Sequence, residues 1–327
     1  MAWSVIEGQS TALEMLQAHL RQGRVASAYL FVGPAGVGKQ LTAIELAKAI
    51  NCATGGADAC GAEACDSCRR IDRQVHPDIH RMSPEGAAQA IRIETIREVL
   101  GRIALRPFMA RRQVVLIDGA DRLTDEAANA LLKMLEEPPS QAMFILLAGQ
   151  TSACLPTVVS RCHVIRFQRL PDRVIEQRLV TEGQSEAQAR SIARLASGSL
   201  ASAGEIREEW DAYAAILERL ACADASSWLG WTAPTDRKEL ARWIACSIAR
   251  LRETAVTAAA SDADAFDPER CVETAVSFIE LAEALEQMAN ARLVGTLLRE
   301  RWMDLLETSR GVRSSKLEVR SAVRHNV

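Results

Sequence analysis

The feature that most constrains the fold of this chain is the glycine-rich stretch Gly33–Gln40. It matches the pattern G-x-x-x-x-G-K through Gly33, Gly38 and Lys39. Gly36 is a further glycine within it. Glycines in this arrangement let backbone N–H groups curl around phosphate oxygens, while the lysine ammonium reaches the outer phosphates. The stretch therefore predicts a phosphate-binding loop.

The residues around this stretch agree with a loop between a strand and a helix. An apolar run of strand length, 28–32, precedes it, and residues 41–50 have the apolar spacing of a helix. The residue after the lysine is usually Ser or Thr, whose hydroxyl binds Mg²⁺. Here it is Gln40, whose longer, neutral amide fits the strict magnesium octahedron poorly. We therefore expect a loop built for a nucleotide that binds ATP and Mg²⁺ weakly or not at all.

A second apolar strand, predicted over 113–118, ends in the carboxylate of Asp118. An acid at such a strand tip can hold Mg²⁺ through water, as the second half of a nucleotide site. In active ATPases of this broad class the next residue is commonly Glu, which orients the attacking water, but here it is Gly119. The simplest interpretation is a site without its second carboxylate. The alternative is an active ATPase in which Asp121 replaces it.

Four cysteines lie within residues 52–68, after the helix that follows the loop. Zinc binds four thiolates in a tetrahedron, and a Cys-x-x-Cys pair supplies two of them from one tight turn. Because four thiolates leave no open position, such a zinc ion would be structural. The chain has nine cysteines, an odd number that favours free thiols plus a metal site over disulfides. The alternative is four unliganded thiols. The predicted zinc ligands are Cys52, Cys60, Cys65 and Cys68.

The remaining pattern indicates how the chain is organised. Further buried strands are predicted over 143–148 and 163–167, with helical segments between the strands. This alternation around a phosphate loop favours an α/β fold with a parallel sheet and helices on both faces. Beyond residue 171 the pattern is helical almost throughout, and the tryptophans of the last part are expected to anchor a core. We predict an α/β domain over 1–167, with the cysteine module 52–68 inserted, a small helical domain over 168–207 and an all-helical domain over 208–327.

Composition narrows the classes of function that remain. The chain has 327 residues and a net charge of −3, so its bulk charge does not favour a protein that coats nucleic acid. No run reaches the roughly 18 consecutive apolar residues that a membrane span needs. The first residues also lack the basic and apolar blocks of a signal peptide. We therefore expect a cytoplasmic protein, in which any contact with DNA would have to come from a local patch or from partners.

Two further motifs make the chain similar to a known family. They are the stretch 129–139, which reads NALLKMLEEPP, and the triplet Ser160, Arg161 and Cys162. Together with the phosphate loop and the four cysteines, these motifs resemble the bacterial clamp-loader branch of the AAA+ ATPases. The resemblance implies an AAA+ domain, a small helical lid and a helical collar that joins a ring of subunits.

The same resemblance implies a place in the DNA-directed DNA polymerase holoenzyme. In this branch a five-membered ring that includes the gamma/tau and delta subunits opens the beta sliding clamp and places it on primed DNA. Gln40, Gly119 and Ala201 depart from the gamma/tau motor subunits, which implies a stator that neither polymerises DNA nor hydrolyses ATP. Its Arg161 would act as an arginine finger on the ATP of a neighbouring subunit, because a guanidinium can bind γ-phosphate oxygens bidentately.

Three alternatives stay open. The first is a catalytically active AAA+ ATPase of the gamma/tau type that uses Lys39 and Asp118. The second is a zinc-containing nucleic-acid-binding module that acts alone, which the slightly acidic charge balance and the few aromatic residues disfavour. The third is that Arg161 only makes a salt bridge within its own chain.

Overall fold

The structure of the chain is a computed structural model, and it describes residues 2–54, 60, 64–86, 89–139, 141–222, 228, 230–260 and 267–324. Part of the predicted cysteine module, residues 55–59 and 61–63, lies outside the described residues. The chain forms two compact units, Met1–Gly204 and Glu205–Val327. The domain boundaries predicted at 167 and 207 stay predictions. Within the part of the chain that the structure describes, no helix combines the length and the apolarity needed to cross a membrane.

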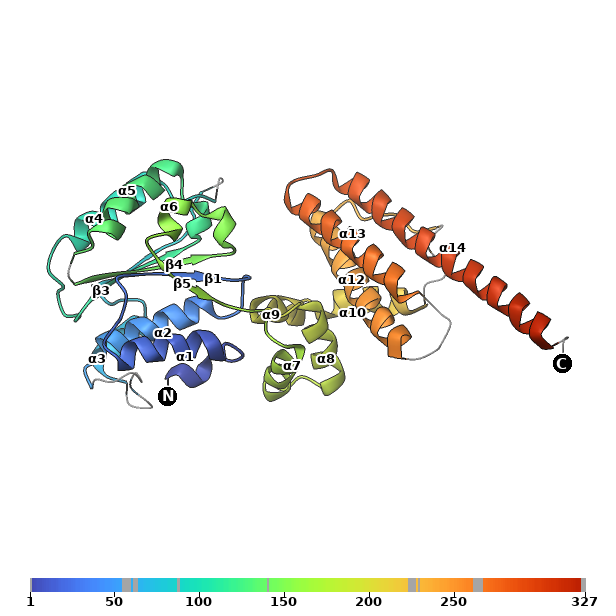
Figure 1. The fold of residues 1–327 in the computed structure, drawn as a ribbon, viewed down its shortest axis with the longest axis horizontal. Coiled ribbons are helices and arrows are strands. Elements are labelled where there is room, and N and C mark those ends of the chain that lie inside the picture. Colours follow the sequence, from blue (N-terminus) through green and yellow to red (C-terminus); the bar gives the residue numbers. More distant parts are fainter. Residues whose placement is uncertain are drawn as a thin grey trace. The chain divides into compact units, whose positions relative to one another are not determined.

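A five-stranded parallel sheet forms the centre of the first unit (Figure 1). Its strand order is β2-β3-β4-β1-β5, and β1 pairs Tyr29 with Ile145 on one side and with His163 on the other. The apolar runs of β1, β3 and β4 are almost entirely buried, because helices lie on both faces. The α/β fold class predicted from the sequence is confirmed. The strands are β1 (Ala28–Val32), β2 (Ile79–Met82), β3 (Gln113–Asp118), β4 (Ala142–Ala148) and β5 (His163–Arg166).

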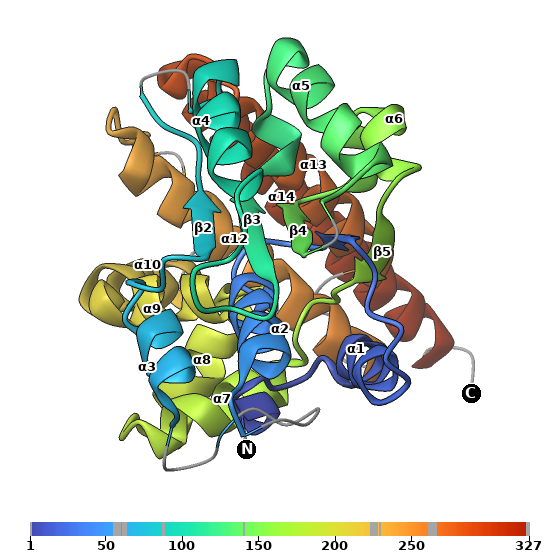
Figure 2. The same ribbon diagram turned by 90° about the vertical axis from the view of Figure 1, so that its left-hand side faces the viewer.

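The helices of the first unit form a layer on each face of the sheet, as Figures 1 and 2 show. One core contains Leu30 and the other contains Phe31, because neighbouring side chains of a strand point to opposite faces. The layer against Leu30 consists of α4 (Ile93–Ile103), α5 (Asp125–Glu136) and α6 (Pro156–Val159). The opposite layer consists of α1 (Ser10–Arg21), α2 (Lys39–Asn51) and α3 (Asp66–Asp72). Short 3-10 helices lie at Ala2–Val5, Ala120–Arg122 and Thr151–Ala153.

Strand β2 is an element that the sequence pattern does not predict. It pairs only with β3 at the edge of the sheet, and only His80 and Met82 of its four residues are buried. A short edge strand with alternating burial lacks the continuous apolar run that marks the central strands. The sheet therefore has one more strand than the sequence indicates.

The helical region after the sheet begins within the first unit. It contains α7 (Asp172–Thr181), α8 (Glu186–Leu195) and α9 (Leu200–Glu208). Ile175 and Leu179 of α7 and Ile192 of α8 are buried, which follows from their spacing on one face of each helix. Ser185 begins α8 as its N-cap, since its side chain accepts a hydrogen bond from the backbone N–H of Gln188.

The second unit is helical and has an aromatic core. Trp228 stacks on Trp302 with ring centroids 5.5 Å apart, and Trp231 meets Trp243 edge-on at 5.2 Å. The indole Nε1–H of Trp302 donates to Ser247 Oγ at 3.0 Å, so its polar end is satisfied. Four of the five tryptophans of this part are buried, as expected for core anchors, whereas Trp210 is only partly buried. The helices of this unit are α10 (Trp210–Cys222), α12 (Arg237–Ala260), α13 (Pro268–Glu286) and α14 (Ala291–Arg324).

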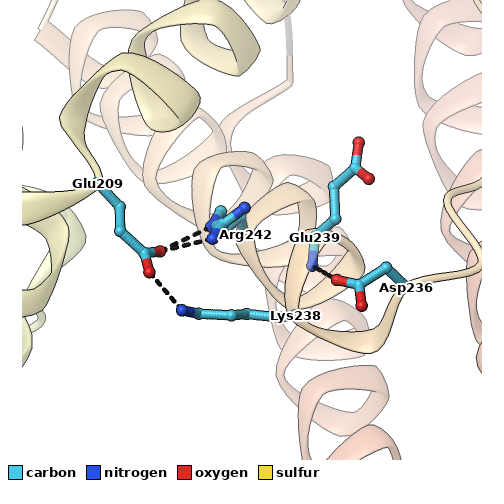
Figure 3. A network of polar contacts seen from close by, with 5 residues as sticks. All are labelled: Glu209, Asp236, Lys238, Glu239 and Arg242. Atoms are coloured by element: carbon cyan, nitrogen blue, oxygen red, sulfur yellow. Dashed lines mark hydrogen bonds and ion pairs between the residues drawn. The ribbon is translucent and has the colours of Figure 1, made fainter.

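A polar network ties the start of α10 to α12 (Figure 3). Glu209 forms an ion pair with Lys238, and its other carboxylate oxygen accepts hydrogen bonds from Arg242 Nε at 3.0 Å and Nη2 at 2.6 Å. Asp236 accepts a hydrogen bond from the backbone N–H of Glu239, which closes the first turn of α12. The Glu209 contacts therefore join the start of α10 to α12.

A buried carboxylate organises the loop that joins α4 to β3. Asp78, which is 3% exposed, accepts backbone hydrogen bonds from Phe108 at 2.7 Å and from Met109 and Ala110 at 2.8 Å each. Burial alone would raise the pKa of Asp78, but the three N–H donors lower it below the usual range. The ionised carboxylate is therefore the form that stabilises the fold.

We expect Asp78→Asn to cost about 2 kcal/mol at pH 7, because the new amide donor would face backbone N–H donors. Hydrogen exchange at the amides of 108–110 should speed up accordingly. Since the folded pKa is depressed, the contribution of Asp78 is full above its unfolded pKa of about 3.9 and is lost as the pH falls through the folded value. The matched control is Asp66→Asn, because Asp66 makes an exposed ion pair with Arg70. Unchanged exchange at 108–110 in Asp78→Asn would contradict this account.

Candidate functional site

The predicted phosphate loop lies at the carboxyl-terminal edge of the sheet. It follows β1, and its last residue, Gly38, precedes α2 with a left-handed φ of 100° that suits glycine. Since all strands are parallel, the end of β3 brings Asp118 to the same edge. The structure therefore gathers the predicted residues Gly33, Gly36, Lys39 and Asp118 at one edge of the sheet. Burial lowers the pKa of Lys39, and the nearby Asp118 and Asp121 partly offset that effect.

The ammonium of Lys39 points back into its own loop. Its Nζ donates to the backbone oxygen of Gly33 at 2.5 Å and to that of Pro34 at 2.6 Å. These two carbonyls accept two of the three N–H donors of the ammonium. A bound nucleotide would have to replace both carbonyls as hydrogen-bond acceptors before Lys39 could bind its phosphates.

The start of α9 packs directly on the loop. The backbone N–H of Leu200 donates to the oxygen of Gly36 at 3.0 Å. A Cβ atom at Gly36 would lie 2.2 Å from Ser199 Oγ and 2.7 Å from Ala201 Cβ, so only glycine fits there. Ala201, near which the family resemblance implies a nucleotide-sensing arginine, thus places only a methyl group next to the loop.

Gln9 is a residue of this site whose role the sequence pattern did not indicate. Its side chain is buried, and Nε2 donates to the backbone oxygens of Val37 at 3.2 Å and Gln168 at 2.7 Å. Its Oε1 accepts the backbone N–H of Gln168 at 3.1 Å. Gln9 thereby joins the start of α1, the phosphate loop and the segment after β5. The Gly-Gln pair at the start of a helix was the available signal, but nothing local shows these distant partners.

The positions that departed from an active ATPase have definite surroundings. Gln40 is exposed as the second residue of α2. Gly119 has a φ of 86°, and a Cβ atom there would lie 2.9 Å from Pro84 Cγ, so an acidic side chain lacks room. Asp121 accepts the backbone N–H of Gly149 at 3.4 Å, at the end of β4. Burial raises the pKa of Asp118, an effect that Lys39 partly offsets.

The four predicted zinc ligands come together. The sulfur atoms of Cys52, Cys60, Cys65 and Cys68 lie within 4.8 Å of one another, close to the spacing of about 3.8 Å that a Zn–S length of 2.3 Å gives in a tetrahedron. Burial would raise the pKa of Cys52, but hydrogen bonds from Thr54 and Cys60 lower it to about 6, whereas burial and the neighbouring thiols raise the pKa of Cys68. The cluster can therefore hold a metal ion such as zinc.

Arg161 lies at the opposite edge of the sheet from the phosphate loop. It follows α6 and precedes β5, whose last residue, Arg166, pairs with the last residue of β1. Strand β5 alone separates its two ends by about 10 Å, at 3.3 Å per residue. The Arg161 side chain is 34% exposed and pairs with Glu136, with Nη2 at 2.5 Å and Nε at 2.8 Å from Oε1. A salt bridge within the chain is thus present, and Arg161 does not belong to its own phosphate site.

Comparison with known proteins places the chain in a family. The model of the family described as DNA polymerase III, delta subunit, matches residues 8–171, which is half of the chain. The chain belongs to this family. Relatives named DNA polymerase III subunit delta' share 35% identity over 201 residues in Bacillus subtilis and 39% over 138 residues in Pseudomonas aeruginosa. The predicted resemblance to the clamp-loader family, and within it to the delta-prime subunit, is confirmed.

The extent of these matches is limited. They cover 61% and 42% of this chain and 59% and 42% of the two delta' relatives, so about half of each relative is spanned. The tau subunit of Escherichia coli is 35% identical over 62% of this chain and 32% of its own length. A solved structure from Thermotoga maritima, described as a DNA polymerase III gamma subunit-related protein, has 16% identity, a TM-score of 0.44 and coverage of 92% of this chain and 99% of its own.

The packing of α9 on the loop makes a prediction for glycine substitutions. Gly36→Ala should lower the free energy of unfolding by about 1–3 kcal/mol more than Gly23→Ala, because the new methyl group would overlap Ser199. Gly23 is the matched control, since its φ of 65° is close to the 71° of Gly36 but nothing lies within 4 Å of its Cβ position. Urea unfolding of the two variants measures the difference. Equal losses would mean that α9 does not close the loop in solution.

Proposed function

We propose that this chain is the delta-prime subunit of the DNA polymerase III clamp loader, and that it acts as a stator. It joins gamma/tau and delta in a ring that opens the beta sliding clamp and loads it onto primed DNA in the cytoplasm. It contributes no polymerisation and no ATP hydrolysis of its own. Instead it offers Arg161 to the ATP of a neighbouring subunit. Membership of the delta-subunit family supports this proposal for residues 8–171.

The observation that carries the proposal is the position of Arg161. It lies at the amino-terminal end of β5, while the loop that could bind phosphate follows the carboxyl-terminal end of β1. An arginine at that edge can reach only a phosphate that another subunit supplies. Its guanidinium is always charged and carries five N–H donors that suit bidentate phosphate binding.

The chain's own loop supports a non-hydrolysing role. Lys39 is bonded to loop carbonyls, and Gln40 offers no hydroxyl to a magnesium ion. The position of the usual water-orienting acid is Gly119, where Pro84 leaves no room for a side chain. We infer that ATP and Mg²⁺ are not working cofactors of this site, although it retains Gly33, Gly38 and Asp118 of the nucleotide-binding motifs.

We propose that the cysteine cluster holds one structural zinc ion. Four sulfur atoms within 4.8 Å suit a closed tetrahedral site, which has no open position for a substrate. Cys52 follows α2, and Cys65 and Cys68 begin α3, so the ion would join these two helices.

The decisive experiment compares Arg161→Ala with Arg173→Ala in a loader rebuilt with gamma/tau and delta. Hydrolysis at the site next to Arg161 should fall by about 10³–10⁵-fold, the usual worth of an arginine finger. Because other sites of the ring can continue to work, clamp loading onto primed DNA is measured together with ATPase activity. Arg173 is an exposed arginine on α7 and serves as the control. Wild-type ATPase activity and clamp loading in Arg161→Ala would refute the proposal that Arg161 acts as an arginine finger.

The isolated wild-type chain separates this function from the alternative of an active gamma/tau-like ATPase. Calorimetric titration with ATP and Mg²⁺ should give weak or no binding, and the purified chain should show no turnover. Steady-state hydrolysis by the pure chain would favour the alternative, in which Lys39 and Asp118 work with Asp121.

Metal analysis of the purified chain should find one zinc ion per molecule. Cys65→Ser should reduce that content strongly, because the remaining three thiolates form an incomplete tetrahedron. Cys271→Ala is the control, since Cys271 is buried in α13 of the other unit. Full zinc content in Cys65→Ser, or none in the wild type, would count against the site.

A further inference from the structure

The contact that leads beyond the proposed function is the ion pair between Glu136 and Arg161. The two residues come from different elements, since Glu136 ends α5 and Arg161 follows α6. Glu136 Oε1 accepts from both Nε, at 2.8 Å, and Nη2, at 2.5 Å. One carboxylate oxygen thus holds the side edge of the guanidinium.

The stability of α5 gives no reason for an acid at this position. A negative charge in the last turn lies at the negative end of the helix dipole, which is unfavourable. The next residue, Glu137, is the C-cap and is exposed. Of these two neighbouring acids, Glu136 meets the guanidinium of Arg161, so the contact itself is what offsets the unfavourable charge.

The remaining contacts fix the plane of the guanidinium. Nη1 donates to the backbone oxygen of Thr157 at 3.0 Å and to Ser160 Oγ at 3.3 Å. Glu136 bonds the edge formed by Nε and Nη2, and Thr157 and Ser160, from the turn before Arg161, bond Nη1. The edge formed by the two terminal nitrogens is the one that binds phosphate bidentately, and these partners determine its direction.

We propose that Glu136 is a positioning residue for Arg161, an inference that rests on the proposed function. It orders the guanidinium before a neighbouring subunit presents its ATP. A long arginine side chain loses much rotamer freedom when it binds, and a partner that has already ordered it removes that cost from the transition state. Nη1 can then exchange Thr157 and Ser160 for a phosphate oxygen, while Nη2, which Glu136 holds through one N–H, offers its second N–H.

The test uses the full loader and three variants, Glu136→Ala, Glu136→Gln and Glu137→Ala. Glu136→Ala should lower kcat by about tenfold with little change in KM, which corresponds to about 1.4 kcal/mol of barrier. Glu136→Gln should retain most of the activity, because its amide oxygen can still accept from Nε and Nη2. Glu137→Ala removes the neighbouring charge and should match the wild type. Thermal unfolding of each variant shows whether α5 remains intact.

A double variant separates failure of this inference from failure of the proposed function. In an Arg161→Ala background, Glu136→Ala should cause no further loss, because its effect acts through Arg161. If Arg161→Ala has wild-type activity, the proposed arginine-finger role of Arg161 is itself wrong. If Arg161→Ala is impaired but Glu136→Ala has wild-type kcat, only the positioning role is wrong. A rise in kcat in Glu136→Ala would also overturn it, since Glu136 would then compete with phosphate.

Discussion

The parallel direction of the five strands is the constraint on which the rest of the first unit depends. It places every strand's carboxyl end at one edge, so the loop after β1 and Asp118 at the end of β3 must lie together. The same rule places the start of β5, and Arg161 before it, at the other edge. The chain therefore has its phosphate loop at one edge of the sheet and the ion-paired Arg161 at the other. This separation is what the proposed role of Arg161 toward a neighbouring subunit requires.

The phosphate loop itself makes several contacts within its own chain. The Lys39 ammonium donates two hydrogen bonds to loop carbonyls, and the start of α9 packs on Gly36. Gly119 and Pro84 exclude an acid beside Asp118. These separate contacts all lie in the phosphate loop or beside Asp118, and they support the proposal that the site does not hydrolyse ATP.

Buried polar side chains hold the loops of this unit in place. Asp78 gathers three backbone N–H groups, and Gln9 bridges the phosphate loop and the segment after β5. Each is satisfied by backbone partners far away in the chain, which is why neither belongs to a recognisable motif. Such anchors limit how far the segments that they hold can move, namely residues 108–110 and the phosphate loop.

The sequence by itself determined the phosphate loop, the central apolar strands and the clustering of four cysteines, because each depends on residues close together in the chain. It also determined that Gln40 and Gly119 lack the groups of an active ATPase. Only the tertiary structure decided that strand β2 completes the sheet, that α9 packs on Gly36 and that Glu136 holds Arg161. These contacts join residues 25 to more than 100 positions apart, and their geometry follows from how helices and strands pack, which local patterns do not encode.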